Sequence, residues 1–333
     1  MLKLILLIFS LYISAEEIPD LGEIKPQQES PKIKIEISKL SQEGQSFLKV
    51  KNLKEVINIS QKIKSLSDSN SESYYLNGAI NYINGENIKS LKDLELALKF
   101  NPNHDLSLFL IALNYIKLNK FESATVYFER ACKEASYNPF YRYNLSIAYY
   151  INGKYEKSKQ ESENTIKLKE NYYKAKIILA NSLYKLNKKT DSFQIIKELY
   201  EKKIELDDVS PLYIKLLFEE SKNYELVIQT LARKPKLALD EKRLLAYSFM
   251  EEGEYIKAIQ FFKMIIDSDI DTEEDNLGYL KSLIMIGKSD EAEKLFSQLN
   301  RKNFQDKKIY VDTFFNTLEK KSLLRLIYQP YPL

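Results

Sequence analysis

A repeat of 34 residues constrains the fold of this chain more than any other feature of its sequence. Five successive repeats begin at Ile37, Ser71, Asp105, Pro139 and Tyr173. In residues 105–138, apolar residues are spaced i, i+3, i+4, i+7 in two groups, with a turn at Asn119 between them. Such spacing places one apolar stripe on each of two short helices. The sequence therefore predicts a helix–turn–helix unit that buries its stripes against neighbouring units.

Small and turn-forming residues recur in the same register. Position 8 is small in the first five repeats, as a close contact between helices requires: Gly44, Gly78, Ala112, Ser146 and Ala180. Position 15, between the two helices, holds either glycine or asparagine in six repeats: Gly85, Asn119, Gly153, Asn187, Gly253 and Gly287. Glycine, and after it asparagine, adopts the left-handed backbone conformation most easily. We therefore expect a left-handed residue at each of these turns.

The repeat becomes irregular over residues 207–238 and then returns. Lys234, Pro235 and Lys236 interrupt the helical pattern, which resumes two residues out of register at Leu239. We predict an irregular repeat with a hinge at 207–238, followed by repeats 7 and 8 over 239–306. A final helical stretch within 307–333 is expected to cap the open end of the array.

The 34-residue helix–turn–helix unit, with large residues such as Leu108 and Tyr115 around the small Ala112, resembles the tetratricopeptide repeat. The resemblance extends over about residues 37–300. It implies an all-α fold, a right-handed superhelical solenoid with repeats 1–5 over 37–206. The family's aromatic residue at position 4 is only partly kept, since Arg142 and Lys176 stand there in two repeats.

The first 15 residues have the features of a secretory signal peptide. Lys3 precedes an apolar run from Leu4 to Ile13, and the small pair Ser14–Ala15 follows it. This run is shorter than the roughly 20 residues that cross a bilayer. We expect cleavage near Ala15 and export to the periplasm or the outside of the cell, with retention as a membrane anchor as the alternative. No later segment is apolar enough to span a membrane.

Residues 16–36 have no helical period and contain Pro19, Pro26 and Pro31. Proline and glycine punctuate such polar stretches and favour extended conformations. We predict a flexible linker here.

Composition argues against several function classes. The chain has 50 Lys and Arg against 47 Asp and Glu, with both signs alternating along it, which disfavours nucleic-acid binding. It has one histidine, His104, and one cysteine, Cys132. A metal site of Cys/His type or a Ser–His–Asp triad needs more such residues in a suitable pattern. We expect no catalytic, metal or cofactor site, and we expect Cys132 to pack as a small core residue.

The resemblance also implies a binding surface. In the family, positions 2, 5, 9, 12 and 13 of the first helices line a concave groove, and here they are apolar and aromatic in the middle repeats. The candidate partner-binding residues are Tyr75, Tyr82, Phe109, Leu113, Ile116, Tyr143, Ile147, Tyr150 and Tyr184. The alternative is that neighbouring repeats, or the chain's own linker or terminal helix, cover these residues.

These features favour an exported scaffold or adapter that binds a protein or peptide partner, with a role in cell-envelope assembly. A periplasmic carrier or sensor whose groove binds a hydrophobic small molecule, lipid or glycan is the alternative.

Overall fold

A computed structural model describes residues 29–268, 270–288, 290–292 and 294–295. The chain divides into two compact units, with the boundary between Leu118 and Asn119. Every regular element in the described part of the chain is an α-helix. The predicted signal peptide, most of the predicted linker and the predicted cap at 307–333 lie outside the described residues.

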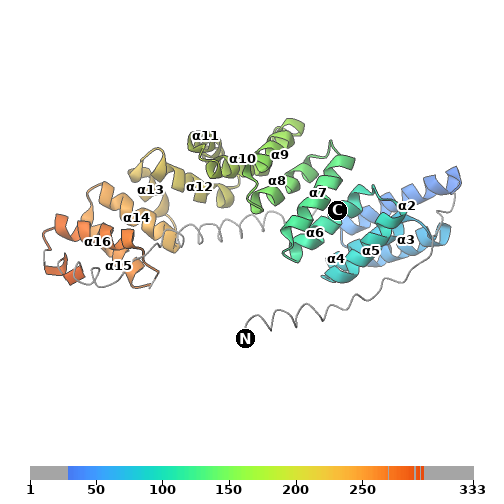
Figure 1. Cartoon of the computed structure of the whole chain (residues 1–333), viewed down its shortest axis with the longest axis horizontal. Coiled ribbons are helices and arrows are strands. Elements are labelled where there is room, and N and C mark those ends of the chain that lie inside the picture. Colours follow the sequence, from blue (N-terminus) through green and yellow to red (C-terminus); the bar gives the residue numbers. More distant parts are fainter. Residues whose placement is uncertain (1–28, 269, 289, 293, 296–333) are drawn as a thin grey trace, which may run out of the picture. The chain divides into compact units, whose positions relative to one another are not determined.

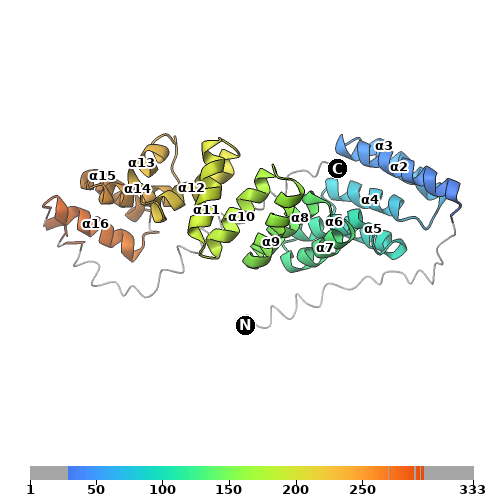
Figure 2. The same ribbon diagram turned by 90° about the horizontal axis from the view of Figure 1, so that it is seen from above.

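Unit 1 contains the first two helix pairs and the first helix of the third. The helices are α2 (Pro31–Lys49), α3 (Leu53–Leu66), α4 (Ser71–Ile83), α5 (Asn87–Phe100) and α6 (Asp105–Lys117). Consecutive helices pack against each other, and the first helices α2, α4 and α6 also contact one another in turn. Figures 1 and 2 show this order, from blue to green.

Unit 2 continues the same arrangement. Its helices are α7 (Phe121–Glu134), α8 (Pro139–Ile151), α9 (Tyr155–Leu168), α10 (Tyr173–Lys185), α11 (Lys189–Glu201), α12 (Leu206–Glu219), α13 (Tyr224–Leu231), α14 (Leu239–Glu251), α15 (Tyr255–Ile266) and α16 (Glu273–Met285). Each helix packs against the next, and the first helices α8, α10, α12, α14 and α16 contact one another in sequence. The first helices thus form a continuous row within this unit.

The helix boundaries follow the repeat register. Helices α4, α6, α8, α10, α14 and α16 begin at the residues where repeats 2, 3, 4, 5, 7 and 8 begin in the sequence. The six predicted turn residues are left-handed, with φ between 57° at Asn119 and 79° at Gly85. Lys51, at the same position of repeat 1, has φ 56°. Because it is neither glycine nor asparagine, the sequence did not mark this turn.

The small residues at position 8 sit where helices approach closely. A Cβ atom added to Gly78 would lie 2.7 Å from Leu94 Cγ. Three buried serines at position 20 add a repeated hydrogen bond to the carbonyl of position 8. These bonds are Ser90 to Gly78 at 2.8 Å, Ser158 to Ser146 at 2.7 Å and Ser192 to Ala180 at 2.7 Å. The two helices of a repeat are therefore tied by a polar contact as well as by apolar packing.

The predicted boundary of the flexible linker at residue 36 is wrong. Helix α2 begins at Pro31, and the Ser30 side chain accepts a hydrogen bond from the Ile33 amide at its N-terminus. Serine is a preferred N-cap residue, and proline is tolerated in the first turn because its missing N–H would have no partner there. Pro31 therefore marks the start of a helix and not a continuation of the linker.

Repeat 6 is helical but differs from the others. Pro211 lies inside α12, α13 has only 8 residues, and Glu205 and Lys222 have positive φ angles of 46° and 49°. Proline inside a helix removes one backbone hydrogen bond. These features account for the irregular sequence pattern at 207–238, while the hinge proposed there stays a prediction.

Candidate functional site

Most of the predicted groove residues are buried. Tyr75, Phe109, Leu113, Ile116, Tyr143, Ile147 and Tyr150 are each at most 5% exposed. Only Tyr82 and Tyr184 are half-buried. Seven of the nine candidate groove residues are therefore buried. Their role in binding a partner stays a prediction, and the alternative reading, burial within the array, describes these seven.

Aromatic contacts within each unit show what covers several of these residues. The Tyr75 ring lies 5.3 Å from the His104 ring, centre to centre. Tyr143 packs on Tyr172 at 5.0 Å, and Tyr150 meets Tyr155 at 5.3 Å. In each of the three pairs the second ring belongs to the N-terminal end of a helix that comes later in the chain: His104 at α6, Tyr172 at α10 and Tyr155 at α9. These tyrosines therefore hold consecutive elements together.

The Tyr143 hydroxyl is buried and has no hydrogen-bond partner. Burial raises the pKa of this phenol well above its usual value, and the nearby Tyr172, Asp208 and Glu205 raise it further. Tyr143 belongs to α8, whereas Asp208 belongs to α12. A carboxylate of repeat 6 thus disfavours ionisation of a phenol of repeat 4.

In unit 1, the half-buried Tyr82 is engaged by a lysine. The Lys117 ammonium lies 3.5 Å from the centre of the Tyr82 ring and donates a hydrogen bond to the Tyr82 carbonyl at 3.0 Å. Burial lowers the pKa of Lys117. This lysine therefore joins α6 to the C-terminal end of α4, where the helix dipole favours a cation.

In unit 2, Tyr184 lies near the C-terminal end of α10 and contacts several charged side chains. Its hydroxyl donates to the Glu219 carboxylate at 3.0 and 3.1 Å. Lys189 pairs with Glu219 at 2.9 Å, and the Lys215 ammonium lies 4.6 Å from the centre of the Tyr184 ring. A phenol, two ammonium groups and a carboxylate are therefore presented together, partly accessible to solvent.

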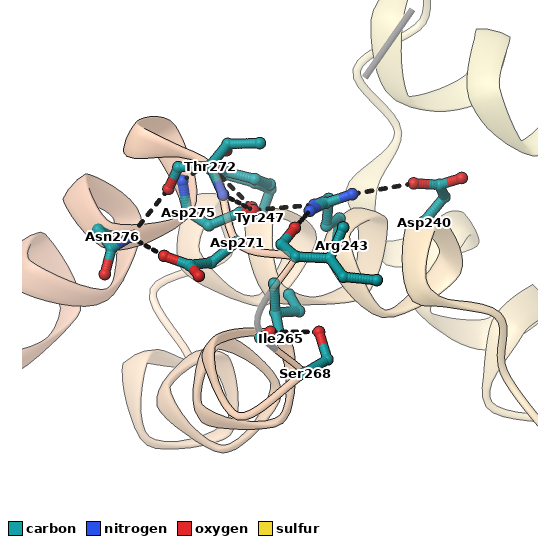
Figure 3. A network of polar contacts seen from close by, with 10 residues as sticks. Asp240, Arg243, Tyr247, Ile265, Ser268, Asp271, Thr272, Asp275 and Asn276 are labelled. Atoms are coloured by element: carbon teal, nitrogen blue, oxygen red, sulfur yellow. Dashed lines mark hydrogen bonds and ion pairs between the residues drawn. The ribbon is translucent and has the colours of Figure 1, made fainter. Parts of the chain in front are cut away.

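A polar network joins repeats 7 and 8 (Figure 3). Arg243 of α14 donates to Asp275 of α16 at 2.9 Å, to Asp240 at 3.1 Å and to the Ile270 carbonyl. Asp275 also accepts a hydrogen bond from the Thr272 amide at 2.9 Å. Because Asp275 is buried and Arg243 nearly so, this ion pair holds the two first helices in register.

Among known proteins, this chain is similar only to solved structures, and the similarity lies in how the helices are arranged. No protein-family model matches the chain, and no curated protein sequence matches it. A tetratricopeptide repeat protein from Parabacteroides merdae is 16% identical, covers 74% of this chain and 98% of its own, and superposes with a TM-score of 0.47. The Naa15/Naa10 complex bound to HypK is 14% identical over 88% of this chain and 51% of its own, with a TM-score of 0.47.

MamA from Desulfovibrio magneticus RS-1 is 17% identical, covers 52% of this chain and 95% of its own, and has a TM-score of 0.43. Because these TM-scores are all below 0.5, the fold is assigned from the chain's own sequence repeat, helix boundaries and helix packing. The described chain is an array of tetratricopeptide-like helix pairs. The predicted all-α fold of such repeats is confirmed.

The tetratricopeptide-like array contains a buried Ser–His–Glu constellation that sequence reasoning missed. His104 Nδ1 lies 2.7 Å from Ser107 Oγ, and Nε2 lies 3.0 Å from Glu72 Oε1. Nδ1 also accepts a hydrogen bond from the Ser107 amide at 3.2 Å, so His104 serves as the N-cap of α6. Glu72 accepts a second hydrogen bond from Ser41 of α2. Because Ser107 is fully buried, its hydroxyl offers no surface to a substrate.

Cys132 is also buried in the array. Burial raises the pKa of its thiol to about 12, with Glu161 and Glu129 adding to this rise and Arg142 opposing it. A thiol with so high a pKa is a poor nucleophile and a poor metal ligand. This agrees with the expectation that Cys132 packs as a core residue.

Two kinds of feature are absent from the described part of the chain. Among these residues, no cluster of three or more His, Cys, Asp or Glu side chains could hold a metal ion. No helix there combines the length and the apolarity that crossing a membrane requires.

Proposed function

We propose that this array is a scaffold that binds polypeptide partners through its row of first helices. The observation that carries the proposal is the continuity of this row, since α8, α10, α12, α14 and α16 contact one another in sequence. A continuous helical face bears side chains at regular spacing, which suits a partner that is itself a chain.

The chemistry of the accessible side chains favours a polypeptide over a hydrophobic ligand. The apolar groove residues Phe109, Ile116 and Ile147 are at most 2% exposed, so a lipid would find little apolar surface there. The half-buried Tyr184 and the charges around it offer donors and acceptors instead. Tyrosine and charged groups of this kind are typical of protein interfaces.

The proposal extends to location. The apolar run at Leu4–Ile13, with small residues after it, supports export of the chain as a periplasmic or secreted protein. In that setting the scaffold would hold its partner during assembly of the cell envelope. Fractionation of the native source tests this part, and recovery in the cytosol with residues 1–15 still attached would contradict it.

Affinity capture with a matched pair of variants tests the binding surface. Y184A removes a half-buried tyrosine of the first-helix row, and Y137A removes a tyrosine that is 86% exposed in the turn before α8. We expect Y184A to reduce recovery of a defined partner and Y137A to leave recovery unchanged, with both variants folded by circular dichroism. Equal recovery with the wild-type chain, Y184A and Y137A would contradict the proposal.

A further inference from the structure

Positions 2 and 13 of the repeat change character along unit 2. They are eleven residues apart, so they lie on the same side of a helix, about 16 Å from each other along its axis. In repeats 4 and 5 these positions hold Phe140, Ile151, Lys174 and Lys185. In repeats 6 to 8 they hold Met285 and five carboxylates: Asp208, Glu219, Asp240, Glu251 and Glu274.

The surrounding sequence follows the same division. Residues 240–275 contain 11 acidic and 4 basic side chains, a net charge of −7. Residues 154–189 contain 10 lysines and 4 glutamates, a net charge of +6. The net charge of +3 for the whole chain therefore conceals two oppositely charged parts within unit 2.

The carboxylates of repeats 6 to 8 belong to the first helices of these repeats. Glu251 and Glu274 are exposed, and Asp208 and Glu219 are half-buried. Asp208 lies close enough to Tyr143 of α8 to disfavour ionisation of that phenol. The carboxylates are spread over α12, α14 and α16, so they suit a ligand with several separated cations better than a single ion.

Asp240 supplies an independent indication of a ligand. Its Oδ1 accepts a hydrogen bond from Arg243, but its Oδ2 has no hydrogen-bond partner, although the residue is only 5% exposed. Figure 3 shows this second oxygen directed away from the Arg243 guanidinium. A buried carboxylate oxygen without a donor is costly, and a donor from a ligand would remove that cost.

We infer that the first-helix face of α12, α14 and α16 binds a lysine- or arginine-rich polypeptide segment. The inference rests on the proposed function and names the chemistry of the partner. The ammonium or guanidinium groups of the segment pair with the exposed Glu251 and Glu274, and one of them donates to Asp240 Oδ2. The lysine-rich part at 154–189 repels the same segment, so binding is confined to repeats 6 to 8.

A peptide titration with the full chain tests the inference. The probe is a fluorescent dodecapeptide of alternating lysine and alanine, with a glutamate–alanine peptide as its control, and binding is followed by fluorescence anisotropy. We expect the lysine peptide alone to bind, and its affinity to fall at least about tenfold when salt rises from about 50 mM to about 500 mM. Equal binding of the two peptides would overturn the inference.

Charge-neutral variants locate the site. The pair E251Q and E274Q should weaken binding of the lysine peptide about tenfold. The matched pair E254Q and D267N removes the same charge from exposed positions 16 and 29 of repeat 7 and should change affinity by less than about twofold. D240N keeps an acceptor for Arg243 and should also weaken binding. If the two pairs of variants lost the same affinity for the lysine peptide, binding would depend on net charge alone, and this would overturn the inference.

The outcomes separate this inference from the proposed function. Loss of partner capture in Y184A without any binding of the lysine peptide would overturn the inference and leave the scaffold proposal standing. Tighter binding of the peptide after K320E, K321E and R325E replacement would assign the face to the chain's own basic C-terminal segment, which also overturns the inference of a separate partner.

Discussion

At the scale of single residues, the tyrosines divide into those that pack the array and those that face solvent. The repeat register places Tyr143 and Tyr184 at groove positions of their repeats, yet one is 2% exposed and the other is half-buried. Register gives the direction of a side chain from its helix, but burial depends on how closely the next repeats approach. Sequence reasoning could therefore name these residues and could not assign their exposure.

The Tyr143 hydroxyl gives a prediction with a matched control. It is buried without a hydrogen-bond partner, so Y143F should be neutral or stabilise the fold by about 1 kcal/mol. The Tyr149 hydroxyl donates to Glu129 at 2.5 Å, so Y149F should destabilise the fold by about 1–2 kcal/mol. Chemical denaturation measures both changes. A larger loss of stability in Y143F than in Y149F would contradict this assignment.

Cys132 gives a second prediction at this scale. Because its pKa is raised to about 12, the thiolate is scarce near neutral pH, and burial also blocks reagents. The native chain should therefore react with a thiol reagent at pH 8 far more slowly than the denatured chain. Rapid modification of the native chain, at a rate close to that of the denatured one, would show that the thiol is accessible.

At the scale of elements, the turns between paired helices were the most predictable part of the fold. Glycine or asparagine at position 15 marks a left-handed residue because few other residues adopt that conformation cheaply. The same reasoning missed Lys51, and it missed the start of α2 because Ser30 and Pro31 resemble a linker as much as a helix N-terminus. A serine followed by a proline occurs both in linkers and at helix N-termini, so this pair alone cannot distinguish the two.

The left-handed Lys51 leads to a test. K51G should stabilise the fold by about 1 kcal/mol, since glycine adopts φ 56° without the steric cost that lysine carries. K51A removes the side chain but not that cost and should give no gain. The converse change G85A, at φ 79°, should destabilise by a similar amount. Thermal unfolding compares the three variants, and equal stability of K51G and K51A would argue against strain at this turn.

Glu72 connects the first three repeats and predicts a dependence on pH. Burial opposes its ionisation, but the hydrogen bond and charge of His104 and the hydrogen bond from Ser41 lower its pKa overall below 4.5. A carboxyl whose pKa is lowered by folding stabilises the fold above its unfolded pKa and loses this contribution as pH falls through the folded value.

Below about pH 4.5, the wild-type chain should therefore lose more stability than E72Q. H104N keeps a capping side chain on α6 but loses the ring nitrogen that hydrogen-bonds Glu72, so its acid dependence should fall between the two. Denaturation curves from about pH 6 to about pH 3 provide the measurement. Parallel curves for the wild-type chain and E72Q would contradict the role given to Glu72.

At the scale of the whole molecule, the sequence predicts the fold better than the surface. Repeats of 34 residues predict the helices, because every repeat supplies the same evidence again. The surface offers no such redundancy. Arg243 pairs with Asp240, three residues away, and with Asp275, 32 residues away, so no local sequence pattern predicts this network. The carboxylates at positions 2 and 13 could have been read from the sequence once the register was known.

The row of first helices in unit 2 is the surface that we propose binds a polypeptide. Site-specific photo-cross-linking in the native source tests this proposal most directly. A photoreactive residue would replace Tyr184 or Glu251 on first helices of unit 2, and Val126 or Ile256 on second helices of the same unit, where they are 53% and 66% exposed. We expect adducts with a defined polypeptide from residues 184 and 251 and none from residues 126 and 256. Adducts formed only from the second helices, or equally from all four positions, would contradict the claim.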